Sequence, residues 1–472
     1  MSWLYWGLMA IYAITILSII GIVLSENRNP VKSLAWVTVL LVVPAFGLIL
    51  YIFFGRNIKN KHRTSRRNRR KLRKFESMSV PHTDRIPMST ESQQQIKLAR
   101  SLTGANFYPG NDARIFITGR EKFDMLINDL NNAQHYIHLQ YYIFEDDKIG
   151  YEIKDILQRK AREGVTVRVI YDHVGCLGVK NKFFKEMQQA GIMVYPFFKV
   201  AFPPFATRIN WRNHRKLCVI DGCIGYIGGM NIADRYIDGT EWGIWRDTHL
   251  RIQGSAVTAL KLSFANDWSF MGQPLIEEVK DVALPVCIDH SMGMQLITSG
   301  PTSQWSNVAM VYLKAIANAK KSVFLQTPYF LPTESLLKAL QSAALSRVDV
   351  RIMIPRRSDS IMLKYASYSY IAECLRAGIK IYFYEPGMLH SKTLVIDDEF
   401  SSVGSTNFDF RSFEYNFESN LIIYSTDFNK QMKEIFVNDM KDCQRITPSA
   451  WRHRSTTQKA LESFMRLFSP IL

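Results

Sequence analysis

The sequence contains little cysteine, and the few cysteines have no spacing typical of a metal-binding or redox site. Six cysteines are spread over 472 residues, and no two of them form a CxxC pair. So sparse a set excludes a dense disulfide framework, and we interpret the thiols as reduced. Cys218 and Cys223 lie close together in sequence but have no matched histidine or cysteine partners, so a zinc site is not expected.

The composition also excludes a disordered chain and a fibrous repeat. The sequence is 47% hydrophobic and 12% aromatic, which is enough apolar material for two core-forming domains. The net charge is +17. An excess of this size indicates an anionic partner, but charge alone does not distinguish a phospholipid surface from nucleic acid.

Charged residues are absent from two long segments near the N-terminus. Residues 3–24 and residues 33–54 contain no Asp, Glu, Lys or Arg, and about 20 apolar residues suffice to cross a bilayer. Only eight residues, including Pro30, separate the two segments, and Pro44 within the second is tolerable in lipid. The pattern predicts a transmembrane helical hairpin. A cleaved signal peptide is the alternative, but the start of the chain lacks the basic residues of such a peptide.

Acidic residues are absent from the segment that follows. Residues 56–74 contain eleven Lys or Arg and no Asp or Glu. Basic residues beside a membrane span mark the cytoplasmic side, so we expect a cell-membrane protein with two spans and a cytoplasmic body. Since this segment holds most of the excess charge, nucleic acid is not the expected partner. The segment either attracts anionic lipid, at about 1 kcal/mol per residue, or serves only to set topology.

The rest of the chain alternates strand-like and helix-like stretches, which indicates an α/β fold. It also contains an internal repeat, in which one sequence unit occurs twice. YIHLQYYIF at 136–144 parallels SVFLQTPYF at 322–330, and QAGIMVY at 189–195 parallels RAGIKIY at 376–382. The predicted divisions are the hairpin at 1–55, the basic segment and linker at 56–111, two repeats at 112–280 and 281–445, and an amphipathic tail at 446–472.

Each repeat carries the same set of polar residues at the same offsets. Lys follows His by two positions, Asp by seven and Asn by seventeen; the two sets are His214, Lys216, Asp221 and Asn231, and His390, Lys392, Asp397 and Asn407. Residues two apart on an extended chain share a face, so each histidine and its lysine can point into one pocket. A single HxK would be uninformative, whereas two copies with identical offsets are a specific signal.

Two histidines, two lysines and two asparagines form a set that repels metal ions and suits a phosphate group. Lys and Asn donors match nonbridging phosphate oxygens, on which charge builds in the transition state. One neutral imidazole can attack phosphorus while the other, protonated, gives a proton to the leaving alkoxide. We therefore expect a phosphodiester substrate and no metal. The chain has no GxxxxGK[ST] phosphate loop, which agrees with a reaction that needs no nucleotide cofactor.

These residues resemble the signature of the phospholipase D superfamily, HxKxxxxD followed by GSxN in two copies. The chain also has the predicted hairpin, an NPxKxLAW stretch at 29–36 and an IGGMNIADRY stretch at 227–236. With these features it resembles bacterial cardiolipin synthases over nearly its whole length. The resemblance implies two phospholipase D-like domains that share one active site. It also implies transfer of a phosphatidyl group between two phosphatidylglycerol molecules, giving cardiolipin and glycerol through a phosphohistidine.

The resemblance further implies roles for individual residues. His214 would be the nucleophile and His390 the general acid and base. The phosphate would be held by Lys216, Lys392, Asn231, Asn407 and Ser405. Asp221 and Asp397 belong to the catalytic motif but are expected to brace its loops, and Asp247 and Glu418 would support His390 and His214 respectively. One departure from the family pattern is Gly229, which stands where the motif has Ser.

Several alternatives stay open at this stage. The same groups would hydrolyse a phosphodiester if water reached the intermediate, and another acceptor alcohol, such as phosphatidylethanolamine, could replace the second phosphatidylglycerol. A non-catalytic membrane scaffold is disfavoured because both motifs are intact. The chain lacks the DGxxAR segment of metal-dependent alcohol phosphatidyltransferases. A homo-oligomer is a further alternative.

Two apolar segments have two interpretations each. The FFKVAFPPF loop at 197–205 could enter the membrane interface or pack as a connector. In the tail, Leu461, Phe464, Met465 and Phe468 follow helical spacing, which suits either an interfacial helix or a helix packed on the body.

Overall fold

The computed structural model describes residues 2–25, 30–43, 47, 51, 88–199, 211–276, 292–470 and 472. The chain divides into two compact units, one of residues 1–59 with 200–210 and the other of residues 60–199 with 211–472. The expected boundaries at 55/56 and 280/281, the basic segment at 56–74, Cys287 and most of the loop at 197–205 lie outside the described residues.

The first unit contains helix α1 (Ser2–Ser25) and helix α2 (Pro30–Val42). Ile16, Leu40 and Tyr51 are buried together, and the Trp36 ring packs edge-on to Tyr51 with centroids 5.4 Å apart. Within the part of the chain that the structure describes, no helix is both long enough and apolar enough to meet the requirements of a membrane span.

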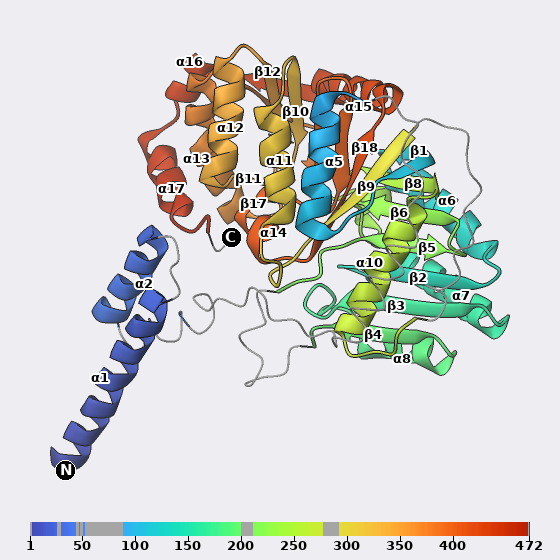
Figure 1. The fold of residues 1–472 in the computed structure, drawn as a ribbon, viewed down its shortest axis with the longest axis horizontal. Helices are drawn as coiled ribbons and strands as arrows, with labels where there is room; N and C mark the ends of the chain where they lie inside the picture. The colour runs from blue at the N-terminus through green and yellow to red at the C-terminus, as the bar shows by residue number, and fades with distance from the viewer. Residues whose placement is uncertain are drawn as a thin grey trace. The chain divides into compact units, whose positions relative to one another are not determined.

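The second unit is built on one 15-stranded sheet whose strand order is nearly symmetric about its centre. The order is β19-β13-β12-β10-β15-β16-β18-β9-β1-β8-β6-β5-β2-β3-β4. β1 (Tyr108–Phe116) and β9 (Met292–Ser299) pair antiparallel at the centre, and corresponding strands of the two repeats follow outward in the same sequence. The duplication seen in the sequence is therefore a duplication of the fold (Figure 1).

The other strands of the first half are β2 (Tyr136–Tyr141), β3 (Thr166–Asp172), β4 (Met193–Phe197), β5 (Leu217–Ile220), β6 (Ile224–Gly228), β7 (Ile244–Arg246) and β8 (His249–Gly254). Those of the second half are β10 (Ser322–Gln326), β11 (Phe330–Leu331), β12 (Asp349–Pro355), β13 (Lys380–Tyr384), β14 (Gly387–Leu389), β15 (Thr393–Ile396), β16 (Phe400–Gly404), β17 (Phe408–Asp409), β18 (Glu418–Tyr424) and β19 (Cys443–Ile446). β2, β3 and β4 run parallel, as do β10, β12 and β13.

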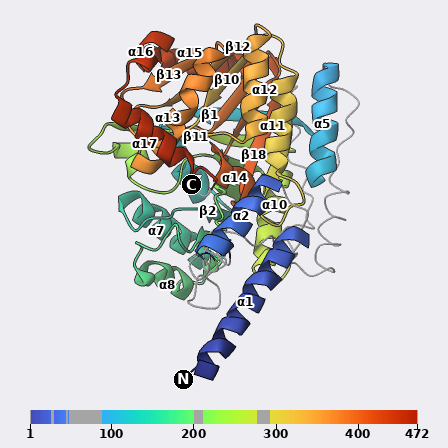
Figure 2. The same ribbon diagram turned by 90° about the vertical axis from the view of Figure 1, so that its left-hand side faces the viewer.

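Helices cover both faces of this sheet (Figure 2). Those of the first half are α6 (Gly119–Asn131), α7 (Lys148–Arg162), α8 (Asn181–Gln189), α9 (Arg235–Asp238) and α10 (Val257–Phe270). Those packed with the second half are α5 (Thr90–Thr103), α11 (Asn307–Ala317), α12 (Glu334–Leu345), α13 (Ile361–Arg376), α14 (Phe410–Glu414), α15 (Thr426–Asp439), the 3₁₀ turn Met440–Asp442, α16 (Pro448–Arg452) and α17 (Thr456–Arg466).

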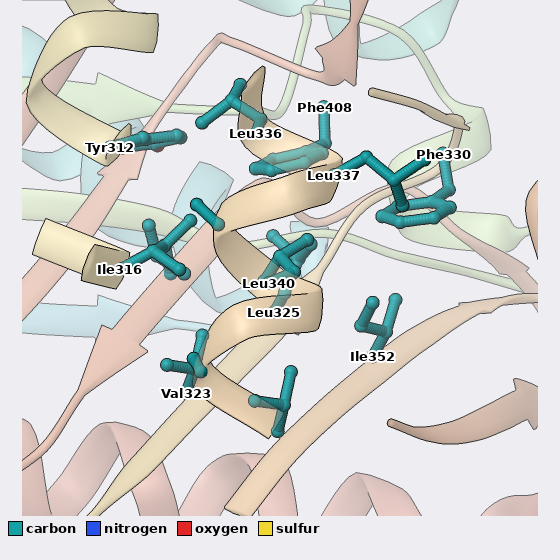
Figure 3. Close-up of a cluster of buried hydrophobic side chains, with 14 of the residues drawn as sticks. Tyr312, Ile316, Val323, Leu325, Phe330, Leu336, Leu337, Leu340, Ile352 and Phe408 are labelled. Carbon is teal, nitrogen blue, oxygen red and sulfur yellow. The ribbon is translucent and has the colours of Figure 1, made fainter. Parts of the chain in front are cut away.

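Alternation along a strand sends neighbouring side chains into different cores, as β10 shows. On β10, Val323 and Leu325 point into the core beneath α11 and α12, whereas Phe324 points into the core beneath α10 and α15. Figure 3 shows Leu336 and Leu340 of α12 among the strand residues of the first of these cores. Strands buried on both faces read as continuous apolar runs, which is why the duplicated strands were recognisable in sequence.

The element bounds add detail at the linker, at two of the expected divisions and in the tail. Residues 90–103, assigned to the linker, form α5, because Ala99 is fully buried in the second-half core and Gln95 Nε2 donates to the Val311 carbonyl at 2.7 Å. The expected divisions at 111/112 and 445/446 fall inside β1 and β19. In the tail, α17 packs on α13 through an ion pair of 2.6 Å between Arg466 and Glu373.

Candidate active site

Each motif histidine is held in place by the backbone of the opposite half. The amide of His214 donates to the Phe417 carbonyl at 2.9 Å, just before β5, and the amide of His390 donates to the Arg246 carbonyl at 2.6 Å, just after β14. The two motifs are therefore fixed where the halves meet, at equivalent places in the repeat.

A buried carboxylate from the opposite half also contacts each imidazole. His214 Nδ1 lies 3.0 Å from Glu418 Oε1, and His390 Nδ1 lies 2.6 Å from Asp247 Oδ2. Neither carboxylate is exposed to solvent. With Nδ1 directed to a carboxylate, Nε2 is the ring nitrogen left to face a substrate.

The motif lysines lie beside their histidines and are buried. Lys216 Nζ donates to the His214 carbonyl at 2.6 Å. Lys392 Nζ donates to the His390 carbonyl, lies 2.8 Å from His390 Nδ1 and is 3.7 Å from Asp247 Oδ2. Each histidine therefore has one buried lysine beside it, and burial lowers the pKa of both lysines.

Burial dominates the protonation of these groups. It lowers the pKa of His390 to about 4, and the neighbouring Lys392 charge adds to this effect, while Asp247 opposes it. Burial also lowers the pKa of His214, against the opposing effect of Glu418. The pKa of Lys392 falls to about 8 for the same reason. Without substrate, both imidazoles are therefore neutral at neutral pH, and a bound phosphate anion would raise their pKa values.

Both histidines line one cavity of about 260 Å³. Its other lining residues are Tyr142, Ile143, Arg212, Asn231, Arg235, Tyr236, Trp245, Tyr329, Asp359, Leu363, Asn407, Asp409, Arg411, Asn416 and Leu472. The residues come from both halves, so the cavity exists only because the repeats pack together. The two imidazoles expected to act together do share one space.

The asparagines and the serine of the motifs are placed differently from one another. Asn231 and Asn407 line the cavity; Asn231 Nδ2 donates to the Tyr236 hydroxyl at 2.9 Å, and Asn407 Oδ1 is buried without a partner among the described residues. Ser405 does not line the cavity. Its hydroxyl donates to Glu418 Oε2 at 2.5 Å, so it holds the carboxylate behind His214, where the resemblance implied a phosphate donor.

The motif aspartates are not among the residues that line this cavity. Asp221 accepts hydrogen bonds of 2.7–2.8 Å from the amides of residues 134–136, and Asp397 accepts hydrogen bonds of 2.7–2.9 Å from those of residues 320–322. Both have positive φ, 51° and 47° respectively. Each one fastens the end of a motif strand to the start of a neighbouring strand, which is a bracing position.

Several residues at the cavity were not singled out from the sequence. Arg212 lies two positions before His214, and Asp409 two positions after Asn407, so the alternation that placed the lysines could have found them. Burial raises the pKa of Asp409 to about 6. Tyr329 and Asp359 follow β10 and β12, and their hydroxyl–carboxylate hydrogen bond is 2.8 Å long. Residues beyond the carboxyl ends of parallel strands commonly form binding sites.

Among the described residues, no three His, Cys, Asp or Glu side chains converge in a way that could hold a metal ion. The polar atoms of the cavity are instead mostly donors, which suit a phosphate group. Two HxK motifs from duplicated halves that meet at one cavity define a protein of the phospholipase D class.

Comparison with protein families narrows this class. The family described as "Cardiolipin synthase, PLD-like domain" matches residues 126–268 and 312–440, and "Phospholipase D-nuclease N-terminal" matches residues 10–56. The chain belongs to the cardiolipin synthase family of phospholipase D-like proteins.

Relatives with curated names are similar over their whole length. The chain is 40% identical to the cardiolipin synthase of Listeria monocytogenes serotype 4a (strain HCC23), over 99% of this chain and 100% of that protein. It is 38% identical to the major cardiolipin synthase ClsA of Bacillus subtilis (strain 168), over 98% of each.

Solved structures share the fold at low sequence identity. The phosphatidylserine synthase of Haemophilus influenzae Rd KW20 matches with a TM-score of 0.61 at 15% identity, over 80% of this chain and 98% of that one. The polyphosphate kinase of Porphyromonas gingivalis matches with a TM-score of 0.50 at 13% identity, over 83% of this chain and 57% of that one.

Proposed function

We propose that this protein is a cardiolipin synthase that transfers a phosphatidyl group from one phosphatidylglycerol to another. The observation that carries the proposal is the single cavity lined by His214 and His390, each backed by a carboxylate from the opposite half. The names of full-length relatives support the same reaction.

In the first step, Nε2 of His214 attacks phosphorus and the bond to the headgroup glycerol breaks. His390, protonated once the phosphate anion is bound, gives its proton to the departing glycerol oxygen. In the second step, neutral His390 takes a proton from a hydroxyl of the second phosphatidylglycerol. That oxygen attacks phosphorus, the P–N bond breaks, and cardiolipin leaves with His214 restored.

Lys216, Lys392, Asn231 and Asn407 would hold the nonbridging oxygens. The ammonium groups would balance charge that grows in the transition state, in a buried setting where such interactions are strong. Glu418 and Asp247 would stabilise each imidazolium as it forms, as the carboxylate of a serine-protease triad does.

The reverse assignment of the histidines also has an observation in its favour. The pKa of His390 is lowered to about 4, and the histidine that is harder to protonate is the better candidate nucleophile. Rapid quench in alkaline denaturant of His214→Ala and His390→Ala enzymes with phosphorus-labelled phosphatidylglycerol distinguishes the two assignments, because a P–N bond to histidine survives base and is lost in acid. Only the variant that keeps the nucleophile can form a denaturation-stable phosphoprotein. Substantial turnover by both variants would contradict the two-histidine scheme.

The reaction itself is tested with purified enzyme and phosphatidylglycerol in detergent, with a metal chelator present. Cardiolipin and glycerol are expected in equal amounts. Phosphatidic acid as the only product would instead establish the hydrolase alternative. Supplying phosphatidylethanolamine as a second defined lipid, followed by mass spectrometry of the products, identifies the acceptor.

We also propose that residues 1–55 form a two-span membrane hairpin with the body on the cytoplasmic side. The support is the charge-free composition of residues 3–24 and 33–54, the basic run at 56–74, and the exposure of apolar side chains such as Trp3, Leu17 and Leu41. Cysteine labelling from either side of the membrane tests the topology. Replacing the arginines at positions 66, 67, 69 and 70 with glutamine tests whether the run also recruits anionic lipid.

A further inference from the structure

The cavity is bordered in the first half by apolar side chains that face solvent. Trp242 and Ile244 are exposed, Ile244 by 52%, and they come just before Trp245, which lines the cavity. The backbone of Ile244 pairs with Gly387 in the small β7–β14 sheet. The exposure of Ile244 is therefore a fixed feature of the fold.

The second half adds two more apolar residues to the same border. Ile361 is 71% exposed, Met362 is also exposed, and the next residue, Leu363, lines the cavity at the start of α13. Arg357 Nη1 donates to the Trp242 carbonyl at 3.4 Å. This contact brings the loop before α13 against the exposed loop of the first half.

Helix α17 packs on α13 and precedes Leu472, which lines the cavity. Figures 1 and 2 both show α17 beside α13, and the two helices are in extensive contact. Phe464 and Leu467 of this segment remain exposed, Leu467 by 74%, while Leu472 lines the cavity a few residues later. We call the exposed set the apolar rim; it consists of Trp242, Ile244, Ile361, Met362, Phe464 and Leu467.

Basic side chains cluster beside the apolar rim. The pKa of Lys364 is lowered by partial burial and by the positive charges of Arg356 and Arg357. The nearby carboxylate of Asp359 already accepts a hydrogen bond from the Tyr329 hydroxyl. A cluster of cations that repel one another is stabilised by anionic phosphates at its surface.

Exposed apolar side chains beside residues that line a cavity, with cations next to them, are typical of a surface that enters the headgroup region of a membrane. We propose that the apolar rim, with Arg356, Arg357 and Lys364, docks the catalytic body onto an anionic phospholipid bilayer, so that the cavity opens onto the headgroups. The inference rests on the proposed function for the identity of the substrate, but the docking itself can be measured without turnover.

The kinetic test uses the full-length enzyme with mixed micelles of phosphatidylglycerol and a nonionic detergent. Ile361→Ser combined with Met362→Ser is expected to raise the surface concentration that gives half-maximal rate by about fivefold, with kcat within about twofold. With short-chain phosphatidylglycerol below its micelle concentration, the variant should match the unaltered enzyme, because a monomeric substrate needs no docking.

Leu345→Ser is the matched control, because Leu345 is 68% exposed at the end of α12 and does not line the cavity. A double variant that behaves like this control in micelles would overturn the proposal. So would an equal loss on monomeric substrate, which would assign Ile361 and Met362 to the cavity.

An optical test separates docking from catalysis. An environment-sensitive fluorophore is placed at Met362→Cys in a Cys223→Ser background, because Cys223 is exposed, and the full-length protein is reconstituted in phosphatidylglycerol vesicles. Brominated lipids should quench this label, and should not quench the same label at Leu345→Cys. An unquenched label at position 362 overturns docking. A quenched label with no cardiolipin formed supports docking and overturns the proposed function.

Discussion

Gly229 and Asp247 occupy one small space: a Cβ on Gly229 would lie only 2.1 Å from Oδ1 of Asp247. In the second repeat the equivalent position is Ser405, whose hydroxyl donates to Glu418 Oε2. Asp247 therefore lies against a glycine of the first motif, whereas Glu418 accepts a hydrogen bond from the serine of the second. The departure from the GSxN pattern in the first repeat makes room for the carboxylate that contacts His390.

Gly229→Ala should lower kcat by about 10²-fold, because moving Asp247 misplaces the His390 ring. KM for phosphatidylglycerol should change much less. The measurement is steady-state kinetics in mixed micelles, and Gly178→Ala is the control, since a Cβ at Gly178 meets open space. Full activity in the Gly229 variant would show that Asp247 does not need its present position.

Short spacing in the sequence carries information only about neighbouring residues of the site. The two-residue offset predicts that each histidine and its lysine point into one pocket, because alternation is a local property of an extended chain. The lysines do lie beside their histidines, but only His214 and His390 are among the residues that line the cavity. The pairing of Glu418 with His214 spans 204 positions. It followed from the family resemblance and has no local signal in the sequence.

Other features depend on tertiary packing and have no local signal in the sequence. The segment TESQQQIKLARSLT is mostly polar and was assigned to a linker, yet it forms α5 because Ala99 and Ile96 pack on the second-half core. Tyr329 and Asp359 reach the cavity from the ends of two strands. Only the strand order brings Tyr329 and Asp359 to the same cavity.

The activity should depend on pH in a way that reflects the lowered pKa values. The pKa of His214 lies below its usual 6.5, so the imidazole is neutral at neutral pH. The decline of kcat/KM on the acid side should therefore begin below pH 6.5. The pKa of Lys392 is about 8, so its charge is lost as pH rises past 8, and KM for the anionic donor should increase there.

Lys392→Arg provides the matched test of the alkaline limb. Arginine keeps its charge throughout this range. The variant should therefore have a lower kcat/KM at every pH but should not show the rise in KM near pH 8. Rate profiles between pH 4.5 and pH 10, at constant ionic strength, measure both limbs. An unchanged alkaline limb in the variant would exclude Lys392 as its source.

Asp221→Ala should destabilise the body by about 2 kcal/mol, because three amides lose an anionic acceptor and the residue has positive φ. Asp397→Ala should behave alike. The folded fraction should keep its KM, since neither aspartate lines the cavity. Thermal unfolding in detergent, with exposed Asp112→Ala as the control, measures the effect. Loss of turnover without loss of stability would instead place Asp221 in the chemistry.

Glu418→Gln should lower kcat by about 10² to 10⁴-fold while leaving the fold intact, because glutamine keeps the size of the side chain but removes its charge. Glu418 raises the pKa of His214 against the effect of burial, so without this charge the acid limb of kcat/KM should move to lower pH. A purely structural role would not move that limb. Glu414→Gln is the control, since Glu414 accepts a hydrogen bond from Ser306 and lies outside the cavity lining. An acid limb that stays in place, or that moves to higher pH, would show that the carboxylate does not act through His214.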